Sequence, residues 1–136
     1  MLKIVKKLFR SEYYYFGIIG GTGFVIDSGI FTLLHRELDY PLSRVISILI
    51  AMTFTWFCNR TFTFKATEKI SHREWLRYTK VSVTGALMNF SIFISLCHLS
   101  VLLKQYYIIP LMMATSVTMF FNFTLSKYYV FKPRSR

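Results

Sequence analysis

The chain has 136 residues, of which 54% are hydrophobic and only 17% are charged, and its formal net charge is +11. A soluble domain carries roughly 25% charged residues, so this composition excludes a conventional soluble enzyme and a disordered chain. It is typical of a membrane protein whose cations gather in short loops.

Four stretches are long and apolar enough to cross a membrane, which takes about 20 residues per helix. They run over about residues 14–34, 43–58, 81–103 and 107–125, and the second continues into an amphipathic run at 59–65. Residues 71–80 predict a short interfacial helix before the third span. Because the linkers are too short for another domain, we predict one all-α transmembrane domain over residues 1–136, a bundle of four helices.

Basic residues are distributed unevenly between the two predicted sides of the membrane. Fourteen of the 17 Lys and Arg residues lie at the termini and in the loop between the second and third spans, whereas three flank the other loops. Those three are Arg36, Arg44 and Lys104. Since Lys and Arg are enriched in cytoplasmic loops, we predict that both termini and the central loop face the cytoplasm. Tyr40, Tyr106 and Tyr107 would mark the opposite interface.

The chain is internally similar. Residues 59–65 and 126–132 share the pattern small polar, basic, any residue, aromatic, any residue, Phe, Lys. Upstream, Thr22-Gly23 aligns with Thr84-Gly85, and Asp27 aligns with Asn89. We therefore predict two tandem two-helix repeats, related by a pseudo-twofold axis along the membrane normal, as in transporters with parallel repeats.

Polar and small residues recur at three- and four-residue spacings along one face of every span. Since lipid offers these groups no hydrogen-bond partners, they should point inward. There they either hold helices together or line a polar path. The candidate substrate-binding residues are Asp27, Arg44, Thr55, Asn59, Arg60, Asn89, Asn122 and Lys127.

Asp27 is the only carboxylate deep within a span. An intramembrane acid is a functional-site hypothesis by default, because an ionised side chain costs several kcal/mol there. Its position is in the outer half of the membrane, near Arg44. Asp27 could form an ion pair with Arg44 that closes the outer end, or be protonated and hydrogen-bonded, or take part in the site.

Catalytic and metal-binding patterns do not emerge from the remaining residues. His35, His72 and His98 share no metal-ligand spacing, and no nucleophile–base set can be assembled at a common depth. We therefore expect neither a metal nor a cofactor, and no enzymatic activity. The positive charge is divided among membrane-flanking segments, so anionic lipids or lipid phosphates are expected partners and nucleic acid is not.

The glycine-rich first span and the endings of the second and fourth spans resemble the GtrA-like membrane proteins. The endings are Asn-Arg-Thr-Phe-Thr-Phe-Lys at 59–65 and Ser-Lys-Tyr-Tyr-Val-Phe-Lys at 126–132. The resemblance implies that the protein moves polyprenyl-phosphate-linked sugar across the cytoplasmic (inner) membrane for cell-surface polysaccharide synthesis. A membrane glycosyltransferase would then use the sugar. The motif positions are Asn59, Arg60, Phe62, Phe64, Ser126, Lys127 and Phe131.

Elementary chemistry is consistent with that expectation. The apolar tail of such a lipid stays in the bilayer, and only its anionic phosphate and hydroxylated sugar need polar partners. Four helices make a thin bundle, so we expect a homo-oligomer. Two alternatives stay open: an accessory subunit that scaffolds a membrane glycosyltransferase, and a small drug or metabolite exporter in which Asp27 exchanges protons.

Overall fold

The protein is described by a computed structural model, in which residues 2–106 and 108–132 are placed. Side chains are described from Arg10 onward, with the exception of Lys104. Several residues used for the topology prediction therefore lie outside the described side chains: Lys3, Lys6, Lys7, Lys104, Tyr107, Arg134 and Arg136. The described residues are helical apart from short connections and contain no strand, so the predicted all-α class is confirmed. Four helices are long and apolar enough to span a membrane.

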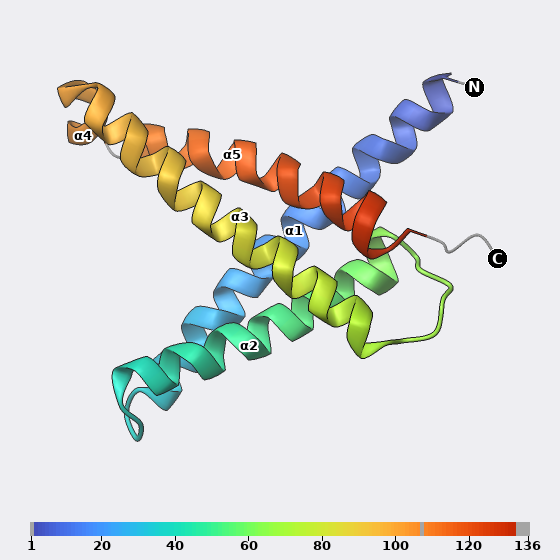
Figure 1. The fold of residues 1–136 in the computed structure, drawn as a ribbon, viewed down its shortest axis with the longest axis horizontal. Helices are drawn as coiled ribbons and strands as arrows, with labels where there is room; N and C mark the ends of the chain where they lie inside the picture. The colour runs from blue at the N-terminus through green and yellow to red at the C-terminus, as the bar shows by residue number, and fades with distance from the viewer. Residues whose placement is uncertain (1, 107, 133–136) are drawn as a thin grey trace. The chain divides into compact units, whose positions relative to one another are not determined.

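The chain divides into two compact units, the first ending at Ser71 and the second running from His72 to Lys132. In the first unit, α1 (Leu2–Leu34) packs against α2 (Tyr40–Cys58), which continues directly into a π-helical turn, η1 (Asn59–Thr63). Pro41 lies in the first turn of α2, where its missing N–H breaks no helical hydrogen bond. The unit is therefore a helical hairpin with a tight connection (Figure 1).

The second unit is also a hairpin. Its first helix, α3 (His72–Leu99), packs against α5 (Ile108–Leu125), which ends in a second π-helical turn, η2 (Ser126–Val130). A short helix, α4 (Val101–Gln105), connects them, and the Ser100 hydroxyl caps it by accepting from the backbone N–H of Leu102 at 3.2 Å.

Hydropathy predicted the four spans but misplaced some of their ends. The predicted separate interfacial helix at 71–80 is wrong, because residues from His72 onward belong to α3, which continues to Leu99. No proline or glycine lies between His72 and Gly85. The polar residues that precede the apolar stretch therefore belong to the same continuous helix. The third span also ends at Leu99 instead of residue 103.

The two hairpins end in the same way, which supports the predicted duplication. The N–H of Phe64 donates to the carbonyl of Asn59, and that of Phe131 donates to the carbonyl of Ser126, each at 2.9 Å. Both bonds join residues five apart, the spacing of a π-helix, which is rare and often found at functional sites.

Buried positions also correspond between the repeats. Along the second helix of each hairpin and the turn that ends it, buried residues recur mostly at every fourth position. Each of the following positions in the first unit has a buried counterpart 67 residues later in the second unit. These positions are Ser43, Ser47, Ala51, Asn59 and Thr63 in the first unit, and Pro110, Ala114, Thr118, Ser126 and Val130 in the second. In the first helices, Phe16, Ile19 and Gly23 correspond to Tyr78, Val81 and Gly85. The duplication therefore extends to packing, while the pseudo-twofold axis stays a prediction.

Topology can be tested with single cysteines in a variant from which Cys58 and Cys97, both free thiols, have been replaced. Glu68 lies in the exposed loop after η1, and Glu37 lies in the exposed connection between α1 and α2. Because basic residues gather on the Glu68 side, an impermeant thiol reagent added to intact cells should label Glu37→Cys and not Glu68→Cys. Labelling of Glu68→Cys from outside would invert the predicted orientation.

Candidate functional site: an intramembrane polar cluster

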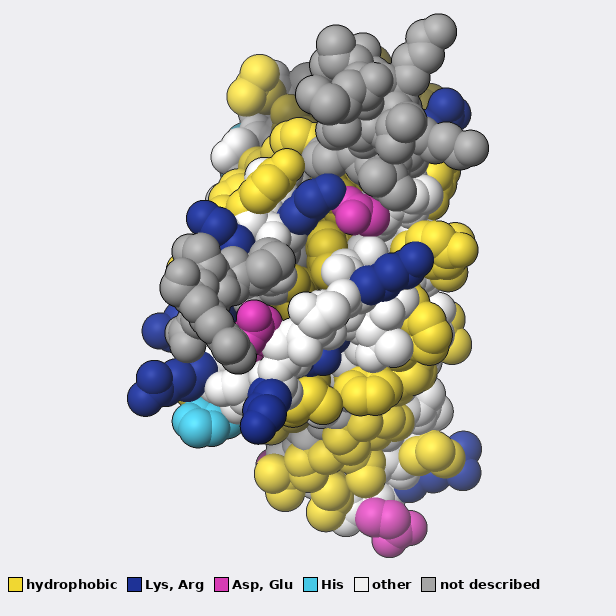
Figure 2. All heavy atoms as spheres, turned by 90° about the vertical axis from the view of Figure 1, so that its right-hand side faces the viewer, with side chains coloured by type: hydrophobic (Ala, Val, Ile, Leu, Met, Phe, Trp, Pro, Cys, Tyr) yellow, Lys and Arg dark blue, Asp and Glu magenta, His cyan; other side chains and the backbone are white. Residues whose placement is uncertain are grey.

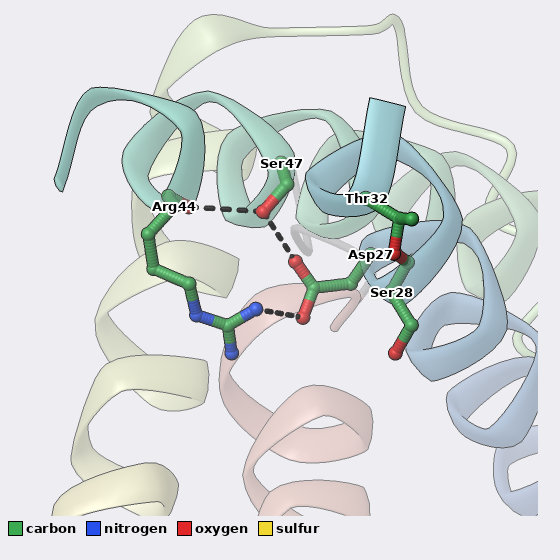
Figure 3. Close-up of polar contacts among 5 residues, drawn as sticks. All are labelled: Asp27, Ser28, Thr32, Arg44 and Ser47. Carbon is green, nitrogen blue, oxygen red and sulfur yellow. Dashed lines mark hydrogen bonds and ion pairs between the residues drawn. The ribbon is translucent and has the colours of Figure 1, made fainter. Parts of the chain in front are cut away.

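Asp27 lies on α1 and faces two side chains of α2. Arg44 donates from Nη1 to Asp27 Oδ2 at 2.8 Å, and Ser47 donates from its hydroxyl to Oδ1 at 2.7 Å. Figure 3 shows both carboxylate oxygens engaged, whereas Ser28 and Thr32, on the same helix, make no bond to this pair. Arg44 and Ser47 are three residues apart, and α-helical geometry places such residues on one face. Of the alternatives that the sequence left open for Asp27, the structure shows the ion pair with Arg44, while a part of Asp27 in substrate binding stays a prediction.

The ion pair is partly open. The Asp27 side chain is 14% exposed and that of Arg44 is 46% exposed. The Arg44 guanidinium also lies over the ring of Phe31, 5.7 Å from its centroid, within the range of a cation–π contact. Pairing and hydrogen bonding offset the cost of placing two charges within helices that are long and apolar enough to span a membrane.

The second hairpin has a neutral counterpart of this cluster. Asn89, which aligns with Asp27, donates from Nδ2 to the hydroxyls of Thr115 at 3.4 Å and Thr118 at 3.2 Å. The position 67 residues after Arg44 holds Leu111. The second hairpin therefore has amide and hydroxyl groups where the first has an ion pair.

Two further predicted site residues lie where the helices approach most closely. A Cβ atom on Gly23 would overlap the methyl group of Thr55, and a Cβ on Gly85 would overlap the side-chain amide of Asn122. Thr55 donates to the Met52 carbonyl within its own helix at 3.0 Å. The structure therefore shows Thr55 and Asn122 in close contacts between paired helices.

The predicted site residues at the ends of the second and fourth spans lie in or beside the π-helical turns. Asn59 is buried, and its Oδ1 accepts from the hydroxyl of Thr63 at 2.9 Å. Arg60 is also buried and donates to the carbonyls of Ala66 and Glu68 in the following loop. Lys127 Nζ lies 5.9 Å from the ring centroid of Phe123. A phosphate-gathering role for Arg60 and Lys127 stays a prediction.

The loop contacts of Arg60 lead to a measurable expectation. Replacing Arg60 by Ala removes two charge-assisted hydrogen bonds to the loop, each of a kind that contributes about 1.5–3 kcal/mol. Trypsin should therefore cut the purified protein at Lys65 or Lys69 at least about tenfold faster, since a tenfold change corresponds to only about 1.4 kcal/mol, and Arg60→Lys should restore part of the protection. Lys127→Ala is the control and should leave loop cleavage unchanged; unchanged cleavage in Arg60→Ala would show that Arg60 does not hold the loop.

Sequence reasoning missed one matched pair of acids. Glu74 is buried near the start of α3, with 5% of its surface exposed, and Glu12 is half-buried in α1. Glu12 precedes Phe16 by four residues, as Glu74 precedes Tyr78. The 62-residue offset that aligned Gly23 with Gly85 also aligns these two acids, so extending the repeat alignment upstream would have found them.

Four apolar spanning helices, with polar clusters held between paired helices, define a multi-pass membrane protein. In Figure 2, hydrophobic side chains, in yellow, cover much of the lower part of the face in view, and Lys and Arg side chains, in dark blue, are scattered over the same face. The chain matches the model of the family described as GtrA/DPMS, transmembrane domain, over residues 15–133, and it belongs to that family. A search of curated proteins returns no match.

Proposed function

We propose that the protein translocates a polyprenyl-phosphate-linked sugar across the cytoplasmic (inner) membrane, for glycosylation of cell-surface polysaccharide. The observation that carries the proposal is the partly open Asp27–Arg44 pair at membrane depth, in a chain of the GtrA/DPMS family. The neutral hairpin of the second unit supports a role for this pair beyond folding. A membrane glycosyltransferase on the outer side would consume the sugar.

The cargo chemistry fits the polar groups along each hairpin. The polyprenyl tail needs no protein partner, since it is as apolar as the bilayer. The sugar hydroxyls are both donors and acceptors, as are the hydroxyls and amides of Ser47, Thr55, Thr118 and Asn122. The phosphate carries negative charge, which Arg44 and the cations at the cytoplasmic ends would attract. Two or more copies of the chain would enclose the headgroup more fully.

The exporter alternative is less well supported. A proton-coupled exporter of cations needs a carboxylate that is available to its substrate. Both oxygens of Asp27 already accept hydrogen bonds from Arg44 and Ser47. An anionic substrate that pairs with the remaining donors of Arg44 fits this arrangement better.

Reconstitution into vesicles tests the proposal. A fluorescent polyprenyl-phosphate sugar is placed in both leaflets, and an impermeant quencher reports the rate at which inner-leaflet lipid reaches the outside. Vesicles with the protein should show exchange above protein-free vesicles and above vesicles with a denatured sample. Exchange at the protein-free rate would refute translocation and favour the scaffold alternative, which a glycosyltransferase co-purification would then address.

A further inference from the structure

Beside the Asp27–Arg44 pair, three rings form a cluster at the closed end of the first hairpin. Phe31 and His35 are stacked, with centroids 5.7 Å apart and an interplanar angle of 10°. Tyr40, from the start of α2, meets Phe31 edge to face at 5.1 Å and His35 at 6.1 Å. Arg44 lies over the same Phe31 ring. The cluster and the ion pair are therefore one continuous group of side chains.

Much of the surface of this cluster is exposed, and several N–H donors of Arg44 are available to a ligand. Tyr40 is 64% exposed, so the neighbouring rings leave most of its surface uncovered. Among the side chains that the structure describes, from Arg10 onward and without Lys104, the only hydrogen bond from the Arg44 side chain goes from Nη1 to Asp27. A guanidinium has five N–H donors, so Arg44 can add a bidentate anion without first releasing Asp27.

Sequence positions in the second repeat make this group specific to the first hairpin. At the offsets of the two repeats, Phe31 corresponds to Phe93, but His35 corresponds to Cys97 and Arg44 to Leu111. Tyr40 likewise corresponds to Tyr107, so two of the three rings have counterparts in the second repeat, whereas the imidazole and the guanidinium do not. Simple packing of a hairpin end does not account for that difference.

The geometry points to a headgroup-binding subsite formed by Tyr40, His35 and Arg44 at the closed end of the first hairpin. In it, a pyranose ring lies against the aromatic side chains and the lipid phosphate pairs with Arg44. The polarised C–H groups on one face of a pyranose suit the electron-rich face of an aromatic ring. The inference rests on the proposed function for the identity of the ligand, and it adds the residues that would distinguish a sugar-bearing lipid from a bare one.

Anchoring in the membrane interface is the competing role for exposed rings at this depth, because Tyr favours the headgroup region. The two roles make different demands on the ligand. A ring that only anchors the hairpin is indifferent to whether the lipid phosphate carries a sugar, whereas a ring that contacts the sugar is not. The test therefore compares two probe lipids on the same variants.

The experiment measures equilibrium binding to the purified full-length protein in detergent. One probe is a short-chain polyprenyl phosphate carrying a hexopyranose, and the other is the same polyprenyl phosphate without sugar. Tyr40→Leu keeps the apolar bulk without the ring, and Tyr40→Phe keeps the ring. Tyr106→Leu, at an exposed tyrosine in the second unit, is the matched control.

We expect Tyr40→Leu and His35→Leu to weaken binding of the sugar-bearing lipid about 3- to 10-fold and to leave the sugar-free lipid unchanged. Tyr40→Phe should bind as the wild type does, and Arg44→Gln should weaken both lipids. Equal weakening of both probes by Tyr40→Leu, or no weakening of either, would overturn the subsite. If the contrast holds in binding but wild-type vesicles show no exchange, translocation fails and the subsite stands.

Discussion

Adding one methyl group at Gly23 is expected to destabilise the first hairpin by about 1–3 kcal/mol, as overpacking of a tight contact does. The new Cβ would overlap the Thr55 methyl group. Thr is β-branched and has few χ1 rotamers within a helix, so the conflict requires α1 and α2 to move apart. Thermal unfolding of the purified Gly23→Ala protein in detergent measures the loss.

A matched rescue separates this contact from a general effect of alanine. Thr55→Ser removes the overlapping methyl group and keeps the hydroxyl, so Gly23→Ala combined with Thr55→Ser should regain most of the stability. Gly20→Ala is the control, because outside the adjoining backbone of its own helix no described atom lies within 4 Å of its Cβ position. Gly85→Ala should cost less than Gly23→Ala, since the overlapping amide of Asn122 is the end of a side chain that can rotate. A stable Gly23→Ala protein would contradict the close helix contact.

Replacing Asp27 by Asn should lower transport per inserted molecule about 10- to 100-fold, with little change in membrane abundance. Hydrogen bonds to charged groups contribute about 1.5–3 kcal/mol, and Asn retains the shape and an acceptor while losing the charge that holds Arg44 in place. Arg44→Gln should lower transport to a similar extent. Transport rate and inserted amount are measured on the same reconstituted vesicles.

The double variant shows whether the two residues act together. If Asp27 and Arg44 work as a pair, Asp27→Asn combined with Arg44→Gln should be no worse than either single variant, because each single change already breaks the interaction. Wild-type transport in Asp27→Asn would remove the charge of Asp27 from the site and leave it a role in helix packing.

Sequence alone predicted most of the fold because lipid imposes strict demands. The four spans follow from the length of apolar chain that a bilayer needs. The Asp27–Arg44 ion pair was one of the alternatives that the sequence left open, because the cost of an unpaired charge within a span can be avoided by pairing or by protonation. The amphipathic ending at 59–65 was recognised as a repeat, but its π-helical conformation was not, since side-chain pattern does not report a shift of backbone hydrogen bonds by one residue.

Details that depend on local backbone geometry could not be predicted. Hydropathy detects only the lipid-facing part of α3, so its polar first turns were assigned to a separate helix. From the sequence, Arg60 was interpreted only as a cation at the end of the second span. Its contacts with the Ala66 and Glu68 carbonyls were not predicted, because they depend on how the loop folds back. Lys65 adopts a left-handed conformation in that loop, with φ of 47°, which nothing in its residue type indicates.

The most direct measurement is the initial rate of leaflet exchange of a fluorescent polyprenyl-phosphate sugar, per inserted wild-type molecule. It is read in vesicles whose protein content and orientation have been determined, beside Arg44→Gln vesicles of equal protein content and protein-free vesicles. We predict wild-type exchange well above the protein-free rate and Arg44→Gln exchange reduced about tenfold or more. Exchange by folded, inserted wild-type protein at the protein-free rate would contradict it.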